Sequence, residues 1–289
     1  MEGKIMLDSF QRVQILSEAL PFIQEFTGGI IVIKYGGSAM KNDQLKNKFI
    51  DDLLFLSYIG IKPILVHGGG PIINSWLQKI DIEPKFEHGM RVTDQQTMEI
   101  VEMVLVGKVN KDLVTLLNKK HSCAIGLSGK DGNLIRASKL FNSENNFVGK
   151  VDSINTRVLD LLLNEKYIPV IASVAADENG QAYNINADTV AGAIAISLKA
   201  EKLILLTDTP GIMYNLDDHS TLVKHLNIVD AKALKNDKII SGGMIPKVDC
   251  CISALQGNVK SAHIIDGRVE HALLLEILTS EGIGSMLTI

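Results

Sequence analysis

Arginine, aromatic residues and cysteine are scarce in this chain of 289 residues. Its 29 basic residues include few arginines, and it has one tryptophan, five tyrosines and eight phenylalanines. The formal net charge is −4, and no segment carries a stripe of lysine and arginine. This composition argues against nucleic acid as an obligate partner. The arginines are Arg12, Arg91, Arg136, Arg157 and Arg268. Each arginine is therefore of interest, because its planar bidentate fork is hard to replace with lysine.

The three cysteines do not suggest a metal site or a disulfide. Cys123, Cys250 and Cys251 lack metal-ligand spacing, and the adjacent pair is not C-x-x-C. We therefore expect reduced, buried thiols, with Cys250 and Cys251 packed inside a helix. No apolar run is long enough to span a membrane, and the N-terminus has no signal-peptide core. The sequence predicts a soluble protein without a membrane partner.

The most informative segment that is present begins at residue 30. Four branched apolar residues, 30–33, predict a buried strand, which leads into Lys34 and the pair Gly36-Gly37. A lysine at the carboxyl end of such a strand lies where open α/β sheets bind ligands, and glycines let backbone amides approach an anion. The segment lacks the spacing of a P-loop. Taken alone, it fits a phosphate cradle or a lysine that simply reaches solvent.

Strand and helix patterns alternate along the rest of the chain. We expect strands at 62–67, 123–128, 133–138, 147–152, 168–172, 203–207 and 261–265. We expect helices at 9–26, 43–60, 71–80, 94–120 with a break near Gly107, 156–166, 187–199, 242–256 and 270–279. Repeated βα units predict an α/β fold with a mostly parallel central sheet sandwiched by helices. The length allows one domain or two lobes, with a boundary around 190–200.

The first helix precedes the first core strand and is amphipathic. Phe10, Val13, Leu16, Leu20 and Ile23 recur every three or four positions, and Gly28-Gly29 ends the helix. Its apolar face needs a partner. That partner is either the helix's own domain or another subunit, and the sequence leaves both open.

Three further segments repeat the pattern of polar or glycine residues at a strand end or helix start. Val66-His67-Gly68-Gly69-Gly70-Pro71 brings glycines from a buried strand to a helix N-terminus, which favours an anion. A second segment places Asn184, Asn186 and Asp188 on one side of the chain as it enters a helix. Asp188 fits an N-terminal helix acid or a polar site that orients cations. The third, residues 241–247, is a glycine-rich helix start that ends in Lys247.

Seven motifs occur in the order of the amino-acid kinase superfamily. They read KYGGSAM, VHGGGP, HGMRVTD, GLSGKDG, YNINAD, LLTDTPGI and SGGMIPK, and they run from about residue 30 towards the C-terminus. Within that superfamily the series resembles the N-acetyl-L-glutamate kinases of arginine biosynthesis. The resemblance implies the amino-acid kinase fold with an N-terminal extension helix. It also implies transfer of the γ-phosphoryl group of MgATP to the side-chain carboxylate of N-acetylglutamate.

The resemblance also assigns roles to residues at matching positions. Catalytic roles would fall to Lys34, Lys247, Asp188 and Gly37, with Asp188 holding both lysines. Substrate would be bound by Gly69, Gly70, Arg91, Asn184 and Asn186. The nucleotide would contact Lys34, Gly36, Gly37, Thr207, Asp208, Gly211, Ile212, Met213, Ile239, Ser241 and Lys247. Mg²⁺ would be held through the nucleotide phosphates, without a metal site made by the protein. Ser38 stands where the family often has alanine, which leaves the chemistry intact.

The implied chemistry needs no catalytic base. A carboxylate with a pKa of about 4.3 is already ionised at neutral pH, so no proton has to be removed. The difficulty is the approach of one anion to another, which positioning and charge compensation overcome. His67 and His88 are candidates for a general base by residue type, but we interpret His67 as structural, because the reaction needs no base.

The ends of the chain resemble the arginine-inhibited, hexameric branch of these enzymes. There the N-terminal helices interlace in a trimer of dimers. The implied effector residues for L-arginine are Lys202, His271, Glu276, Gly282, Gly284 and Met286, with amides of residues 282–286 as donors. The implied domains are an oligomerisation helix at 1–27, an acetylglutamate lobe at 28–198 and a lobe for ATP and arginine at 199–289. A PII signalling protein is a candidate partner. The frequent lysine, isoleucine and asparagine suit an AT-rich plastid genome, so plastid stroma and cytoplasm both stay open.

Other functions on the same fold are alternatives. Glutamate 5-kinase and aspartokinase often carry further C-terminal domains, for which this chain has no spare length. Carbamate kinase is another rival, and uridylate kinase would need a site for a nucleotide acceptor, whereas Arg91 and Asn184 suit a small N-acylated amino acid. A noncatalytic amino-acid sensor would not need Lys34, Lys247 and Asp188 together.

Overall fold

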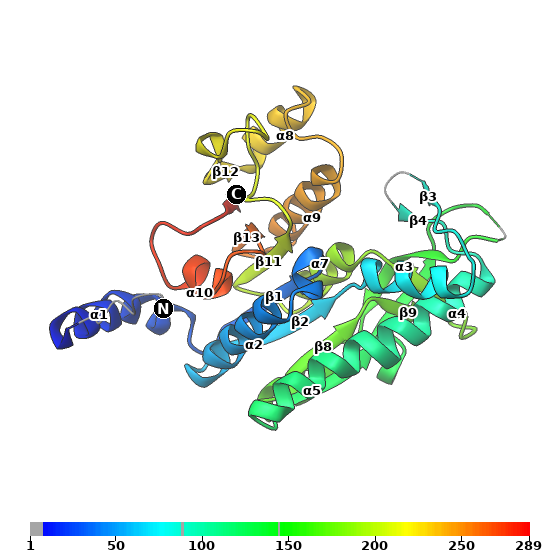
Figure 1. The fold of residues 1–289 in the computed structure, drawn as a ribbon, viewed down its shortest axis with the longest axis horizontal. Helices are drawn as coiled ribbons and strands as arrows, with labels where there is room; N and C mark the ends of the chain where they lie inside the picture. The colour runs from blue at the N-terminus through cyan, green and yellow to red at the C-terminus, as the bar shows by residue number, and fades with distance from the viewer. Residues whose placement is uncertain (1–7, 88–89, 144) are drawn as a thin grey trace.

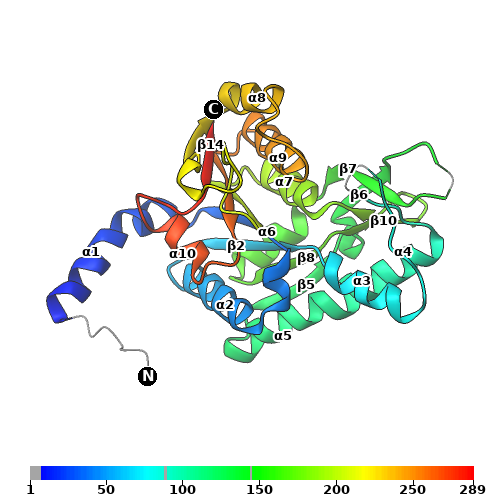
Figure 2. The same ribbon diagram turned by 45° about the horizontal axis from the view of Figure 1, so that its top comes forward.

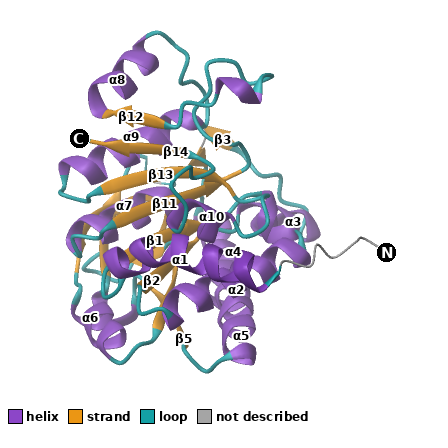
Figure 3. Cartoon of the chain, turned by 90° about the vertical axis from the view of Figure 1, so that its left-hand side faces the viewer, coloured by secondary structure: helices purple, strands orange, loops and turns teal. Residues whose placement is uncertain are grey.

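The structure is a computed structural model that describes residues 8–87, 90–143 and 145–289. Within these residues, eight strands form one sheet with a continuous order (Figure 3). The order is β12 (His225–Asn227), β14 (Ser285–Thr288), β13 (Ser261–Asp266), β11 (Lys202–Thr207), β1 (Ile30–Tyr35), β2 (Lys62–His67), β8 (Ile168–Ala172) and β5 (Ala124–Ser128). All neighbours are parallel except β13 and β14. The prediction of a mostly parallel sheet is confirmed.

Helices cover both faces of the sheet, because the central strands are apolar on both sides. In β1, Ile31 and Ile33 pack into one core, whereas Val32 packs into the other. The first core also contains residues of α2 (Asp43–Tyr58), α3 (Gly70–Lys79), α4 (Gln95–Glu102), α5 (Asn110–Lys120) and α10 (Ala272–Ile277) (Figure 1). The second contains residues of α6 (Arg157–Asn164), α7 (Ala187–Ser197), α8 (Ile228–Asn236) and α9 (Met244–Gln256). Burial on both faces explains why these strands read as unbroken apolar runs.

A smaller barrel and a hairpin extend the chain beside α4. The barrel consists of β6 (Ile135–Lys139), β7 (Val148–Ile154), β9 (Val174–Ala176) and β10 (Ala182–Ile185), and the hairpin of β3 (Phe86–Glu87) and β4 (Met90–Arg91). The sequence predicts β6 and β7 but misses the other four strands, which are too short for alternation to be recognised. It also misses α8, β12 and β14, and the short 3-10 turns η1 (Ser38–Lys41), η3 (Asp131–Asn133) and η4 (His219–Thr221).

The expected break near Gly107 is a change of helix type. Between α4 and α5 the chain continues as a π-helical segment, η2 (Met103–Val109), so the backbone stays helical from Gln95 to Lys120. Such wide turns are rare and occur often at functional sites. Leu105 and Val109 of this segment pack close to Gly69, where an added Cβ would lie 2.6 Å from Leu105 Cδ2. The wide turn therefore belongs to the wall behind the second glycine loop.

The N-terminal helix α1 (Ser9–Phe26) extends away from the sheet (Figure 2). Asp8 caps it, and its carboxylate accepts a hydrogen bond from the Gln11 amide at 2.8 Å. Phe26 is buried, but Phe10 and Leu16 are 77% and 69% exposed. The apolar stretch that includes Phe10, Val13, Leu16 and Leu20 is thus not covered by the chain's own domain. None of the described helices is long and apolar enough to cross a membrane.

Candidate active site

Two glycine loops leave the same edge of the sheet side by side. Strands β1 and β2 are parallel, with Lys34 opposite Val66 and Tyr35 opposite His67, so their following loops are adjacent. Both loops line a cavity of about 320 Å³. Among the residues that line it are Lys34, Gly36, Gly37, Gly69, Gly70, Arg91, Asn184, Asn186, Asp188 and Lys247. The two glycine loops therefore share one cavity.

An aspartate joins two lysines at the base of this cavity. Asp188 Oδ1 lies 3.1 Å from Lys34 Nζ, and Asp188 Oδ2 lies 2.7 Å from Lys247 Nζ. The three side chains are 6%, 11% and 16% exposed. Burial acts to raise the pKa of Asp188, but the two lysines outweigh it, and the pKa is lowered. Burial lowers the pKa of Lys34, and Asp188 offsets part of that effect. Asp188 therefore carries charge and keeps two cations close together.

Local structure explains how these three residues reach one point. Lys34 is the last residue but one of the buried strand β1, and Lys247 lies in the first turn of α9. Asp188 lies in the first turn of α7, where the side chain of Asn186 caps the helix and accepts from the Asp188 amide at 2.8 Å. Asp188 is thus a helix-terminal acid that also forms ion pairs with two lysines.

Cys250 packs behind this cluster, one turn after Lys247. Its Sγ donates to the Asp188 carbonyl at 3.0 Å, and burial raises its pKa to about 12. Burial likewise raises the pKa of Cys251, which is fully buried. Both thiols stay protonated at neutral pH and pack in α9, as expected.

Arg91 forms one wall of the cavity and has an unused donor. Its Nη2 donates to Asn74 Oδ1 at 2.6 Å and to the Gly70 carbonyl at 3.3 Å, and its guanidinium lies over the Phe86 ring at 4.9 Å. Arg91 is 7% exposed, and its Nη1 has no hydrogen-bond partner among the described residues. A buried cation with a free donor suits an anionic ligand. Asn184 is more fully engaged, because its Nδ2 donates to Thr93 Oγ1 at 3.1 Å.

The expected nucleotide residues do not line this cavity, apart from Lys34, Gly36, Gly37 and Lys247. Asp208 follows β11 and closes over the first glycine loop, where its Oδ1 accepts from the Ser38 amide at 2.9 Å and the Ser38 hydroxyl at 2.8 Å. Gly37 has φ +79°, and an added Cβ would lie 2.6 Å from Asp208 Oδ1. The remaining members, Thr207, Gly211, Ile212, Met213, Ile239 and Ser241, stay outside the lining. Ile212 and Met213 are buried, so their side chains serve the core.

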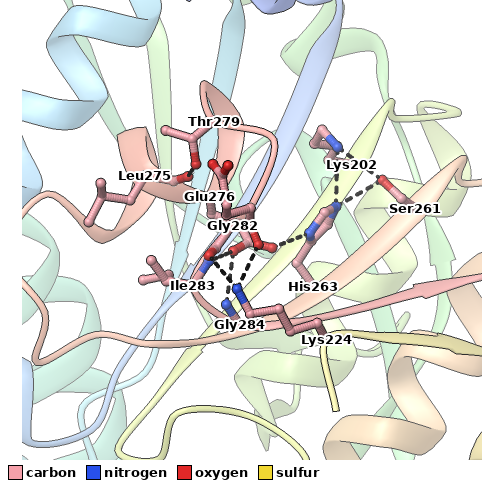
Figure 4. Close-up of polar contacts among 11 residues, drawn as sticks. Lys202, Lys224, Ser261, His263, Leu275, Glu276, Thr279, Gly282, Ile283 and Gly284 are labelled. Atoms are coloured by element: carbon pink, nitrogen blue, oxygen red, sulfur yellow. Dashed lines mark hydrogen bonds and ion pairs between the residues drawn. The ribbon is translucent and has the colours of Figure 1, made fainter. Parts of the chain in front are cut away.

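A second cavity, of about 210 Å³, holds most of the expected effector residues (Figure 4). Lys202, Glu276, Gly282, Gly284 and Met286 line it together with Phe22 and Phe26 of α1. His271 is not among its lining residues. Its Nδ1 lies 2.6 Å from Asp52 Oδ1, because a left-handed backbone at the start of α10 directs it towards α2.

The polar groups of this second cavity bond mainly to one another. Glu276 Oε1 lies 2.7 Å from His263 Nδ1, and Glu276 Oε2 accepts from the amides of Ile283 at 2.7 Å and Gly284 at 3.0 Å. Lys202 Nζ lies 3.2 Å from His263 Nε2 and 4.7 Å from the Phe26 ring centre. Three of the amides across 282–286 thus already donate within the protein, those of residues 283 and 284 to Glu276 and that of Met286 to the Lys224 carbonyl at 2.8 Å. Their role as donors to an effector stays a prediction. His263 was missed, because a histidine inside an apolar strand gives no local signal.

Other residues near the active-site cavity were missed for the same reason. Asn74, Phe86, Leu105 and Asn110 lie in segments that carry no recognisable motif, and only the fold brings them to the glycine loops. Thr93 lies inside the HGMRVTD motif, but only the structure shows its contact with Asn184. His67, which we interpret as structural, is fully buried. His88 lies outside the described residues.

Comparison with known proteins identifies the family. Residues 29–266 match the model of the amino acid kinase family, which is most of the chain. Acetylglutamate kinase from Gracilaria tenuistipitata var. liui is 68% identical over 285 residues, 98% of this chain and 100% of that protein. This chain is an amino acid kinase of the acetylglutamate kinase group.

Further relatives agree. Acetylglutamate kinase from Thermosynechococcus vestitus is 61% identical over 98% of this chain and 96% of that protein. Among solved structures, N-acetylglutamate synthase from Neisseria gonorrhoeae, complexed with coenzyme A and N-acetyl-glutamate, has a TM-score of 0.84 at 24% identity. That match covers 98% of this chain but 64% of the synthase, and it shows a shared fold alone. Relatives named acetylglutamate kinase thus match this chain along nearly their full length.

Proposed function

We propose that this protein transfers the γ-phosphoryl group of MgATP to the side-chain carboxylate of N-acetyl-L-glutamate, which gives N-acetyl-L-glutamyl 5-phosphate in arginine biosynthesis. One observation carries the mechanism. Asp188 holds Lys34 and Lys247 at 3.1 and 2.7 Å in a cavity that both glycine loops line. Two cations and a set of backbone amides around one point suit the transfer of a phosphoryl group between anions.

In this mechanism an oxygen of the substrate carboxylate attacks the γ-phosphorus. A bond from that oxygen to phosphorus forms as the bond to the β–γ bridging oxygen breaks, and ADP leaves. No proton moves, since the carboxylate is ionised at neutral pH. Lys34 and Lys247 stabilise charge from two sides, and the amides of Gly36, Gly37 and Gly69 contact the moving group. Mg²⁺ would arrive bound to the nucleotide phosphates and would neutralise part of their charge.

Substrate recognition falls to residues on the other wall of the cavity. Arg91 would bind the α-carboxylate through Nη1, the donor that has no partner among the described residues. Asn184 and Asn186 would contact the N-acetylamino group, beside Gly69 and Gly70. The nucleotide base and ribose would lie on the C-terminal side, along residues 207–213, 239 and 241. The placement of substrate and nucleotide agrees with the proposed lobes 28–198 and 199–289. The central sheet is continuous across the proposed boundary, because β1 pairs with β11.

A hydroxamate assay tests the function, because hydroxylamine traps an acyl phosphate. We expect an ATP-dependent signal with N-acetylglutamate and none with glutamate, aspartate or bicarbonate. UMP as acceptor, followed by ADP release, covers the uridylate kinase alternative. A chain with no signal on any acceptor would be a sensor on the kinase fold and would contradict the proposal.

We further propose that L-arginine inhibits the enzyme through a hexamer built as a trimer of dimers. Two observations support this. The apolar stretch of α1 is exposed, since 77% of Phe10 is accessible to solvent. The C-terminal end of α1 lines the second cavity through Phe22 and Phe26. Glu276, 8% exposed, supplies a carboxylate for a guanidinium. A PII signalling protein is a proposed partner. The relatives from a red alga and a cyanobacterium support a plastid or cytoplasmic setting.

Removal of residues 1–26 is expected to leave catalysis intact, abolish hexamers and weaken inhibition by arginine. The physical reason is that the deletion removes the exposed apolar stretch of α1 and also the Phe22 and Phe26 wall of the second cavity. Mass measured by light scattering and activity measured against arginine concentration check this. The matched variant Leu16→Asp places a charge in the exposed apolar stretch of α1 but keeps Phe22 and Phe26 beside the second cavity. It therefore separates the effect on hexamer assembly from the effect on arginine binding. A hexameric truncated chain would overturn the assembly proposal.

A further inference from the structure

Two buried polar side chains lie beneath the second glycine loop. His67 ends β2 and Asn110 begins α5, and both are fully buried. Asn110 Nδ2 lies 3.1 Å from His67 Nε2, and His67 Nδ1 lies 3.0 Å from the Gly68 carbonyl oxygen. Asn110 Nδ2 also donates to the Val170 carbonyl of β8 at 2.8 Å. The pair therefore links the loop to the sheet and to the helix that follows the π-helical turn.

These contacts fix the tautomer of His67. The Gly68 carbonyl can only accept, so Nδ1 must carry the proton. Asn110 Nδ2 is a donor, so Nε2 must be the acceptor. The identity of Nδ2 is supported by the Val170 carbonyl, which also requires a donor there. Burial lowers the pKa of His67 to about 4, so the ring stays neutral at neutral pH.

The hydrogen bond to Gly68 acts on the next residue through peptide geometry. The carbonyl of Gly68 and the amide of Gly69 belong to one planar trans peptide, in which C=O and N–H point in opposite directions. A carbonyl held against the buried histidine turns the Gly69 amide away from the core. Gly69 lines the active-site cavity, and its amide is one of the proposed contacts of the phosphoryl group. The Gly68 amide is fixed as well, since it donates to the Tyr35 carbonyl at 3.1 Å.

We propose that His67 and Asn110 are positioning residues, which hold the Gly68–Gly69 peptide so that the Gly69 amide faces the transferred phosphoryl group. This rests on the proposed function, because it assigns a cause to the orientation of that amide. The pair acts without touching substrate. It also gives the π-helical turn a role, since the segment that brings Leu105 and Val109 against Gly69 leads directly into Asn110.

Replacement of His67 by two different side chains tests the proposal. An asparagine at this position would place its amide nitrogen near the position of Nδ1 and can still donate to the Gly68 carbonyl, whereas leucine cannot. We expect His67→Asn to keep kcat within about fivefold of the wild type and His67→Leu to lose about 10²-fold, the scale of a small misplacement in an active site. A general base would instead be lost in both variants. Equal loss in both, or no loss of kcat in His67→Leu, overturns the proposal.

The control is a polar anchor at the other end of the same helix. Asn118 Oδ1 accepts from the amides of Cys123 and Ala124 at 3.0 and 2.8 Å, away from the cavity. Asn118→Ala is expected to lower Tm with kcat and KM unchanged, so a fall in Tm alone does not explain the His67→Leu result. Nitrogen NMR of the His67 ring gives an independent check, and an Nε2–H tautomer overturns the proposal. Wild-type inactivity on N-acetylglutamate would instead refute the proposed function.

Discussion

Replacement of Lys247 by alanine is expected to lower kcat by about 10²- to 10³-fold, the usual cost of losing one charged group that stabilises a transition state. Lys247 is 16% exposed and is held by Asp188 at 2.7 Å, so its ammonium group is already in place before the reaction begins. In a partly buried cavity, water molecules cannot stabilise negative charge as well as an ammonium group that is already oriented. Lys34→Ala is expected to have an effect of the same order, because Lys34 lies on the other oxygen of Asp188.

Initial rates at saturating ATP and N-acetylglutamate measure this loss. The control is Lys120→Ala, which breaks an ion pair with Asp51 on the surface between α5 and α2. That variant removes the same charge far from the cavity and should keep wild-type kcat, since exposed ion pairs contribute little. If Lys247→Ala retains wild-type kcat, the two lysines held by Asp188 are not the source of catalysis, and the proposed mechanism fails.

Replacement of Asp188 by asparagine is expected to damage both activity and stability. The change leaves two lysines with their charges close together, without the carboxylate that compensates them. Breaking a buried ion pair on one side costs about 3–5 kcal/mol of the free energy of unfolding. We expect kcat to fall at least as far as in Lys247→Ala, because both cations lose their position. The pKa of Lys34, already lowered by burial, should fall further, so activity is lost at a lower alkaline pH than in the wild type.

The stability effect of Asp188 also has a defined pH dependence. The folded-state pKa of Asp188 is lowered, so its carboxylate stabilises the fold above the unfolded pKa of about 3.9. That contribution to stability is lost as the pH falls through the lowered pKa of Asp188 in the folded state. The difference in Tm between wild type and Asp188→Asn should therefore be full at pH 7 and shrink below about pH 4. Asp51→Asn is the matched control, because it removes an exposed carboxylate that pairs with Lys120. A Tm difference between wild type and Asp188→Asn that is constant with pH would refute this account.

The central elements of the fold could be predicted because their signals are local. The run 30–33 is apolar on both faces, and the structure buries Ile31 in one core and Val32 in the other. The helix that carries Asp188 starts after an asparagine cap, and the helix that carries Lys247 starts after two glycines. The short strands of the barrel could not be predicted. They are held by pairing with distant segments, as β10 is with β7 and β9, and not by their own pattern.

The active site divides in the same way. The sequence by itself determined which segments place a lysine or glycines at a strand end or a helix start, which are the positions where α/β folds favour anions. Only the tertiary structure decided that Lys34 and Lys247 meet on one aspartate, that Asn110 lies against His67, and that His271 pairs with Asp52 away from the second cavity. Motifs depend on neighbours in the chain. These contacts depend on which strands and helices pack together, and no single segment contains that information.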